Sequence, residues 1–236
     1  MSFFSIFRKS NAFLPVIHVT DDRQALRNAN IAAENGADGI FLICHEDDAE
    51  GSKLLFAYDC VRRAHQNWWI GLNFLSTELE AVIDLLPADA SGYWSDTAGL
   101  LPVGKDRFEI ARRVHQHRLA HPNKQLLSFG GVSFKHQDDT NDVEQAVRDA
   151  ADAQPYVDVI TTSGSRTGTP PSIQKIQAMK AVLKLHPLAI ASGMASENVE
   201  PFLPCTEAFL VATSISKNFY ELDPKKVRAF AHAIGR

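Results

Sequence analysis

Short apolar runs alternate with longer stretches of helical periodicity along almost the whole chain. Eight of these runs have the length and composition of buried strands. They are Leu14–Val19, Gly39–Cys44, Trp69–Phe74, Gly92–Trp94, Gln125–Phe134, Val157–Thr161, Pro187–Ala191 and Ala208–Ala212. Because strands that alternate with helices form a parallel sheet wrapped by helices, eight such units predict an α/β fold of the (β/α)8 barrel, or TIM barrel, type.

The segments between these runs carry the apolar spacing of amphipathic helices. The expected helices are Arg23–Asn35, Gly51–Gln66, Thr77–Leu86, Phe108–His121, Asp142–Ala153, Pro171–His186, Ser196–Leu203 and Pro224–Ile234. A doubly wound open sheet is the rival arrangement, but it favours a glycine-rich loop after the first strand, and this chain has Val19-Thr-Asp-Asp there. No low-complexity linker divides the chain, so one barrel domain is expected over residues 1–236, with residues 1–13 as an N-terminal extension.

The first ten residues are apolar and then basic, which reverses the order of a secretory signal peptide. They are also too few to span a bilayer. We expect Phe3, Phe4, Ile6 and Phe7 to cover the N-terminal end of the barrel. A weak membrane-surface anchor is the alternative, which a single short apolar patch supports poorly.

Composition narrows the class of protein. Hydrophobic residues make up 45% of the chain and charged residues 22%, as in ordinary globular domains. The net charge of −4, with dispersed Lys and Arg, offers no basic stripe for nucleic acid. Cys44, Cys60 and Cys205 are widely spaced and form no CxxC pattern, so neither a disulfide framework nor a cysteine zinc site is predicted. These features predict a cytoplasmic protein with no nucleic-acid partner and no integral membrane association; a homo-oligomer is left open.

Functional side chains of a barrel gather at the C-terminal ends of its strands. That rule selects four catalytic candidates: His18, Asp96, Lys135 and His136. A neutral His18 suits acid or base chemistry near neutral pH, and a hydrogen-bonded structural role is the alternative. Asp96 is a candidate base or hydroxyl acceptor. Lys135 would meet a phosphate or carboxylate as a cation, or else act as a nucleophilic amine.

Two late strands each end in small residues: Ser192 and Gly193 after the seventh, and Ala212, Thr213 and Ser214 after the eighth. In many barrels these two loops present backbone N–H groups to a phosphate, which small residues allow to approach closely. We therefore predict a phosphate-binding site at these five residues.

Small hydrogen-bonding residues are densest between the sixth expected strand and the following helix. Thr162, Gly164, Arg166, Thr167 and Gly168 belong to this segment. They predict a lid over the barrel mouth that binds substrate through hydroxyl and N–H groups; an ordinary flexible loop is the alternative. Asn73, at the end of the third expected strand, is a candidate donor to a substrate carbonyl or ribose hydroxyl.

Two groups of side chains are candidate sites for a divalent metal cofactor, and no other cofactor is indicated. The first group is His45, Asp47, Asp48 and Asp96. Its oxygen ligands suit Mg2+ or Mn2+ in a phosphohydrolase, and a solvated loop is the alternative. In the second group, His117 and His121 share the i, i+4 spacing of helical ligands, but no carboxylate is expected to complete a site.

Five short segments, taken in order, carry a family resemblance. They are Ile70-Gly-Leu-Asn73-Phe-Leu, Val132-Ser-Phe-Lys135-His136, Thr162-Ser-Gly164-Ser-Arg-Thr167-Gly168-Thr-Pro170, Ser192-Gly193-Met-Ala-Ser-Glu197-Asn198-Val199 and Val211-Ala212-Thr213-Ser214. They are similar to the G-x-N, V-x-x-K-H, T-G-x-x-T-G-x-P, S-G-x-x-x-E-N-V and V-G-T-S patterns of the BtpA/SgcQ family. From about Asn73 onward, and more loosely from Val16, the chain resembles that family.

The resemblance implies a TIM barrel of the ribulose-phosphate-binding type and a phosphorylated ligand. Some members of the family are associated with biogenesis of a photosynthetic membrane complex, and others with proposed nucleotide or sugar metabolism. This chain departs from the family pattern in three places: Thr20-Asp21-Asp22 replaces a Pro- and Gly-rich segment, the Glu-Asn pair near Cys44 is not evident, and Ala212 replaces a phosphate-binding glycine.

Three functional hypotheses follow. The first is an enzyme, an isomerase, lyase or hydrolase, that acts on a sugar phosphate or nucleotide. The second is a non-catalytic assembly or biogenesis factor on a barrel scaffold. The third is the divalent-metal phosphohydrolase.

Overall fold

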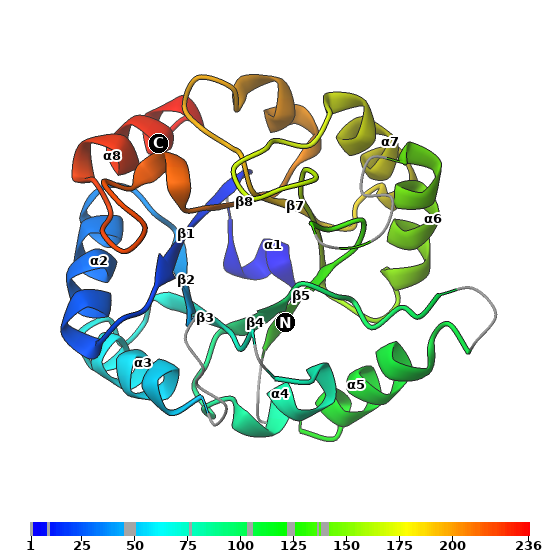
Figure 1. Cartoon of the computed structure of the whole chain (residues 1–236), viewed down its shortest axis with the longest axis horizontal. Coiled ribbons are helices and arrows are strands. Elements are labelled where there is room, and N and C mark those ends of the chain that lie inside the picture. The colour runs from blue at the N-terminus through cyan, green and yellow to red at the C-terminus, as the bar shows by residue number, and fades with distance from the viewer. Residues whose placement is uncertain are drawn as a thin grey trace.

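Eight parallel strands form a closed barrel in the order of the chain, as the sequence predicts (Figure 1). The computed structural model describes residues 2–8, 10–44, 51–75, 77–102, 106–121, 126–135, 137 and 142–236. The strands are β1 (Ala12–His18), β2 (Gly39–Ile43), β3 (Trp69–Asn73), β4 (Gly92–Ser95), β5 (Leu127–Gly131), β6 (Val159–Thr162), β7 (Leu188–Ala191) and β8 (Ala208–Val211). β1 pairs with β8, which closes the ring. The chain is therefore a single-domain (β/α)8 barrel.

A layer of helices surrounds the barrel (Figure 1). It consists of α2 (Asp22–Glu34), α3 (Ser52–Ala64), α4 (Leu79–Leu85), α5 (Glu109–Leu119), α6 (Val143–Ala153), α7 (Ile173–Leu183), the 3-10 segment η1 (Glu200–Cys205) and α8 (Pro224–Ala233). A second 3-10 segment, η2 (Thr213–Ile215), follows β8 directly. Among the described residues, no helix is both long enough and apolar enough to cross a membrane.

One predicted element differs from the structure in type, and another extends past a turn of the chain. The expected helix Ser196–Leu203 is wrong: the β7–β8 connection forms the 3-10 segment η1, which contains Pro201 and Pro204. Because proline has no N–H to donate, these residues interrupt the α-helical hydrogen-bond ladder. The strand expected over Gln125–Phe134 is also too long, because β5 ends at Gly131 and Ser133 adopts a left-handed φ of 44°.

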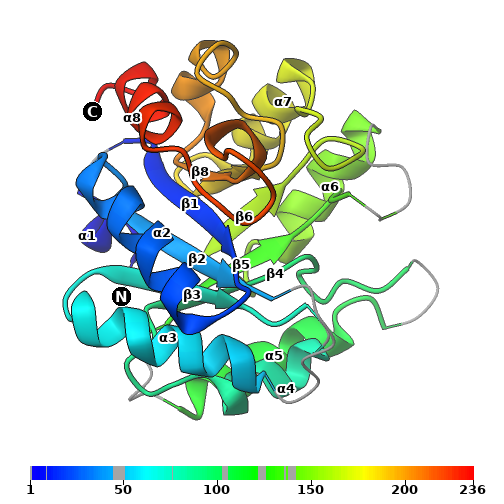
Figure 2. The same cartoon turned by 60° about the vertical axis from the view of Figure 1, so that its left-hand side comes forward.

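The short helix α1 (Phe3–Ile6) lies at the end of the barrel opposite the loops that follow the strands (Figure 2). Phe3 and Phe7 are buried and pack with the residues of the barrel interior. The ring centroid of Phe7 is 5.4 Å from that of Trp69 on β3. The N-terminal segment thus closes the N-terminal end of the barrel, while Phe4 remains half-exposed.

Aromatic side chains fill the middle of the barrel. The Phe41 ring lies 5.0 Å from Trp69, 5.7 Å from Trp94 and 5.1 Å from Phe129, in edge-to-face arrangements that favour packing. A Cβ atom on Gly71 would come within 2.4 Å of the Phe41 ring, so glycine is required beside it. This packed interior leaves the C-terminal ends of the strands as the place for a site.

Candidate active site at the mouth of the barrel

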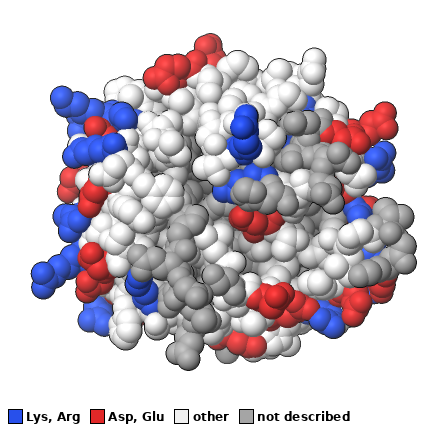
Figure 3. Space-filling model, in the orientation of Figure 1, with Lys and Arg blue, Asp and Glu red and all other residues white. Residues whose placement is uncertain are grey.

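A cavity of about 410 Å³ opens among the loops that follow the strands. It brings together many of the predicted site residues: His18, Asp96, Lys135, Thr167, Gly168, Ser192, Gly193, Ala212, Thr213 and Ser214. Most of its other lining residues are apolar and include Val16, Ile43, Trp94, Leu210 and Phe219. Figure 3 shows this face, where charged side chains gather at the periphery and the middle is mostly uncharged apart from a few groups.

Backbone N–H groups of the β7 and β8 loops line the cavity. Within the described residues, the N–H groups of Gly193, Thr213 and Ser214 have no hydrogen-bond acceptor. All three residues line the cavity. Unpaired N–H groups carry positive partial charge, and several of them in one loop cluster suit a phosphate.

The serine hydroxyl groups of the same loops form hydrogen bonds within the protein. Ser214 Oγ donates to Met194 O at 2.6 Å, which ties the β8 loop to the β7 loop. Ser192 Oγ accepts from Gly168 N at 3.0 Å and holds the lid segment. Asn198 donates to Gly193 O at 2.9 Å and accepts from Ala195 N at 2.8 Å. These side chains shape the loops, so a phosphate would be held by the backbone.

Backbone conformation accounts for the residue types at these loops. Ser192 has a φ of 145° and Gly193 a φ of 71°, a region that residues with side chains rarely adopt. A Cβ atom on Gly193 would lie 2.2 Å from Pro170 N, so the lid packs directly on this glycine. Ala212 has a negative φ of −125°, so this position does not require the positive φ that favours glycine.

Asp96 and Lys135 lie between this cavity and a neighbouring one of about 480 Å³, because both residues line both cavities. Asn73 lines only the second cavity, and its Nδ2 atom is buried with no acceptor among the described residues. His18 faces the first cavity and stacks on Phe219, with ring centroids 4.2 Å apart and an interplanar angle of 15°. The candidate acid, base and cation therefore share one mouth of the barrel.

Three of the predicted lid residues do not line the main cavity. Thr162 is fully buried, and its hydroxyl donates to Ser133 O at 3.2 Å. Gly164 provides room for the returning lid, since a Cβ atom there would lie 2.2 Å from Thr169 O. The Arg166 side chain is exposed, and its carbonyl accepts from Ser192 Oγ. Thr162 and Gly164 thus shape the lid without lining the cavity, and their role in binding substrate stays a prediction.

Lys175 on α7 is a buried residue that sequence reasoning missed. Its side chain is 2% exposed, and Nζ donates to Ser133 O at 2.6 Å and to Ser163 O at 3.0 Å. Ser163 Oγ in turn accepts from Lys135 N at 2.7 Å. Burial lowers the pKa of Lys175 to about 8, and the Asp149 carboxylate opposes this shift. Lys175 therefore joins the loops after β5 and β6, which carry Lys135 and the lid.

Trp94 and Phe219 are two aromatic cavity residues that sequence reasoning missed. Trp94 could have been found from strand alternation, because it precedes Asp96 by two residues and shares its inward direction. Phe219 follows η2 in an irregular loop, and no periodic pattern indicates its position. His136, His45, Asp47 and Asp48 lie outside the described residues, so the metal-hydrolase hypothesis stays a prediction.

The second candidate metal group, His117 and His121, differs from its prediction in one respect. Asp84, on α4, supplies the carboxylate that the sequence was expected to lack, and its Oδ1 atom lies 2.8 Å from His117 Nε2. One ligand atom each from Asp84, His117 and His121 lies within 4.8 Å of the others. The spacing along one helix does not reveal a ligand supplied by a neighbouring helix.

Comparison with solved structures shows the same fold in several enzymes. The (S)-3-O-geranylgeranylglyceryl phosphate synthase of Thermoplasma acidophilum, solved with its substrate sn-glycerol-1-phosphate, is 14% identical, with a TM-score of 0.70 over 99% of this chain and 98% of that chain. Phosphoribosyl anthranilate isomerase of Thermus thermophilus is 15% identical, with a TM-score of 0.60 over 94% and 98%. The 2-keto-3-deoxy-6-phospho-gluconate aldolase of Zymomonas mobilis is 12% identical, with a TM-score of 0.62 over 99% and 96%.

At these identities the likeness establishes the fold and nothing finer. No curated protein matches the chain in sequence. The BtpA family model matches residues 104–236, more than half of the chain, including both loops that carry the unpaired N–H groups. The chain belongs to the BtpA family.

Proposed function

We propose that this barrel binds a phosphorylated small molecule, a sugar phosphate or a nucleotide, at the mouth of the strands and acts on it as an isomerase, lyase or hydrolase. The observation that carries the proposal is the set of unpaired N–H groups of Gly193, Thr213 and Ser214 on one cavity. The substrate sn-glycerol-1-phosphate of the similar synthase supports it, as do the phosphoribosyl and phospho-gluconate groups in the names of the similar isomerase and aldolase.

The side chains around the cavity suit acid–base chemistry beside a bound anion. The Lys135 ammonium would offset phosphate or developing negative charge. His18 and Asp96 would move protons, His18 through its imidazole and Asp96 through its carboxylate. The proposal includes a cytoplasmic location, which is consistent with the unpaired thiols of Cys44, Cys60 and Cys205.

Thr213→Asp tests the anion site. Thr213 is exposed at the cavity and its hydroxyl makes no hydrogen bond within the described residues, so the substitution adds a carboxylate without removing a loop contact. Repulsion between this carboxylate and a phosphate should weaken the binding of inorganic phosphate and ribose 5-phosphate by at least about tenfold. Ser10→Asp adds the same charge at the other end of the barrel and should leave binding unchanged.

Isothermal titration calorimetry gives the affinities, and thermal unfolding shows whether the unliganded variants keep the stability of the original chain. Equal binding by the original chain and Thr213→Asp, or no stabilisation by any phosphate compound, would overturn the proposal. Conversion of a bound compound, followed by phosphorus NMR, separates an enzyme from a non-catalytic assembly factor.

A further inference from the structure

The main cavity has two chemically different ends. The unpaired N–H groups belong to the loops after β7 and β8, whereas Val16, Ile43, Trp94 and Leu210 contribute apolar surface from the strands. A phosphate alone would use only the first of these. The apolar remainder implies a ligand with a sizeable uncharged part.

An aromatic side chain is held rigidly at this apolar wall. Phe219 is 51% exposed, lines the cavity and stacks on His18. Its loop is closed by an antiparallel bridge between Ser216 and Leu222 and by Asn218 Oδ1, which accepts from Tyr220 N at 2.9 Å. An exposed Phe in a well-anchored loop is a feature of ligand-binding surfaces.

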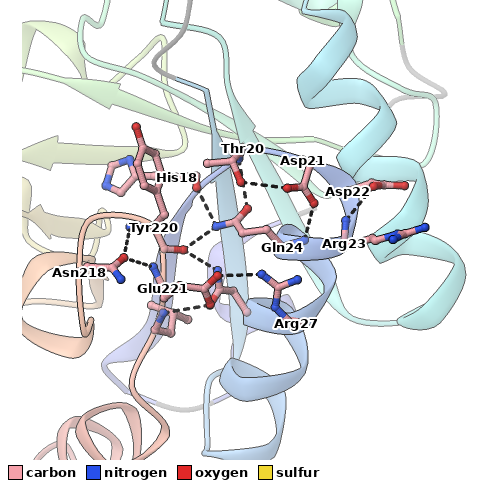
Figure 4. Close-up of polar contacts among 12 residues, drawn as sticks. His18, Thr20, Asp21, Asp22, Arg23, Gln24, Arg27, Asn218, Tyr220 and Glu221 are labelled. Carbon is pink, nitrogen blue, oxygen red and sulfur yellow. Dashed lines mark hydrogen bonds and ion pairs between the residues drawn. The ribbon is translucent and has the colours of Figure 1, made fainter.

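Buried polar side chains of α2 fix that loop in place (Figure 4). Gln24 Nε2 donates to the carbonyls of both His18 and Tyr220, so it joins β1 to the loop. Asn28, which is fully buried, donates to Tyr220 O at 2.8 Å and accepts from Leu222 N at 2.9 Å. The stacked ring pair is therefore positioned before any ligand arrives, which lowers the entropy lost on binding.

A buried hydrogen-bond donor lies on the same wall. Trp94 is 5% exposed, and its Nε1 atom has no acceptor among the described residues. An indole N–H can only donate, and leaving it unpaired when buried is unfavourable. A ring with acceptor nitrogen or oxygen atoms would satisfy it, whereas an aliphatic chain would not.

We propose that the uncharged part of the ligand is a planar heteroaromatic ring, so that the ligand is a nucleoside monophosphate or a similar aryl-substituted sugar phosphate. Phe219 would stack on the ring and Trp94 Nε1 would donate to one of its acceptor atoms. The inference rests on the proposed function, because it assigns the part of the ligand beyond the phosphate. An aliphatic phosphate ester is the competing ligand class.

Binding of four ribonucleoside 5′-monophosphates, ribose 5-phosphate and geranyl monophosphate, each titrated calorimetrically into the full chain, tests the inference. At least one nucleotide should bind about tenfold more tightly than ribose 5-phosphate. Phe219→Ala should remove that advantage and leave the affinity for ribose 5-phosphate within about twofold. Phe56→Ala removes an exposed ring on α3 away from this cavity and is the matched control.

The outcomes separate this inference from the proposed function. Equal affinities for ribose 5-phosphate and all nucleotides overturn the ring assignment while phosphate binding stands. Tighter binding of geranyl monophosphate than of any nucleotide also overturns it and assigns an aliphatic ligand. Binding of none of the probes overturns both proposals. Trp94→Phe, which keeps the ring and removes the N–H, should reduce nucleotide affinity but not ribose 5-phosphate affinity.

A second inference stands on a different part of the molecule, the surface between α4 and α5. His121 Nδ1 lies 2.9 Å from His117 O, a contact that places the proton on Nδ1 and leaves Nε2 with a lone pair. One ligand atom each from Asp84, His117 and His121 lies within 4.8 Å of the others, so small side-chain movements would bring all three onto one tetrahedral metal ion. We infer that Asp84, His117 and His121 form a site for Zn2+ or a similar divalent transition metal.

Zinc titration of the full chain by calorimetry tests this site. Wild-type protein should bind one more equivalent of Zn2+ than His121→Gln or Asp84→Asn, and His232→Gln, an exposed histidine on α8, should match wild type. Co2+ bound to the site should show visible absorption bands that the two site variants lack. The same stoichiometry and affinity in wild type and His121→Gln would overturn the inference.

Discussion

Lys175 makes the stability of this barrel depend on pH in an unusual direction. The folded protein holds its pKa at about 8, below the ordinary 10.5, because the side chain is buried. Between these two values the unfolded chain keeps a proton on this lysine that the folded chain has released. The unfolded state then binds more protons, so stability rises with pH in this window.

The size of the effect follows from the two pKa values. Between about pH 7.5 and 9.5, the difference between the folded and unfolded titrations is worth about 2 kcal/mol. Below about pH 7.5 both states carry the charge and the gain is absent. Lys175→Met removes the titrating group and keeps the length of the side chain, so its stability should lack this contribution.

Urea unfolding at both pH values measures the effect. The stability of wild type relative to Lys175→Met should increase by about 2 kcal/mol on raising the pH, and other titrating groups cancel in this comparison. Lys225→Met, which replaces an exposed lysine on α8, should show a constant difference from wild type. A wild-type advantage over Lys175→Met that changes by less than about 0.5 kcal/mol would refute the argument.

Two further predictions concern packing. Gly193→Ala should destabilise the protein by roughly 2–4 kcal/mol, since it combines a left-handed φ with a clash against Pro170. Gly168→Ala, at a φ of 78° and with no atom within 4 Å of the added Cβ, should destabilise the protein by only about 1 kcal/mol. Equal losses of stability in urea unfolding would contradict the role of the lid contact. Phe7→Ala should reduce the free energy of unfolding by roughly 3 kcal/mol, because it opens a cavity at the N-terminal end of the barrel. Phe4 is half-exposed, so Phe4→Ala should reduce it by well under 1 kcal/mol. A small effect of Phe7→Ala would show that the N-terminal segment is not part of the core.

The barrel could be predicted because its strands are buried on both faces. A strand between a packed interior and a layer of helices reads as a continuous apolar run, and runs such as Gly39–Ile43 and Leu188–Ala191 are fully buried. The end of a strand is harder to predict from the sequence where apolar residues continue past the last hydrogen bond between the strands. Val132 and Phe134 are buried after β5 has ended, in a turn that the Ser133 conformation produces.

The candidate site was predictable only where it depends on strand position. His18, Asp96 and the small residues after β7 and β8 meet at one cavity because each follows the end of a strand. Thr162 is predicted to bind substrate, and strand alternation turns it away from the barrel interior, which Val159 of the same strand faces. Phe219 could not be predicted, since its place depends on contacts with α2, which is distant in sequence.

In the loops at the mouth of the barrel, polar side chains form hydrogen bonds with other loop residues, and these bonds affect which positions tolerate substitution. Ser214, Ser192 and Asn198 fix the course of the backbone, while the N–H groups that remain for an anion belong to whichever residues occupy the positions. A site of this kind tolerates substitution wherever φ stays negative, as it does at Ala212, whose φ is −125°. On the proposed function, loop geometry would set the recognition of the phosphate, and the side chains of the opposite wall would discriminate among phosphate esters.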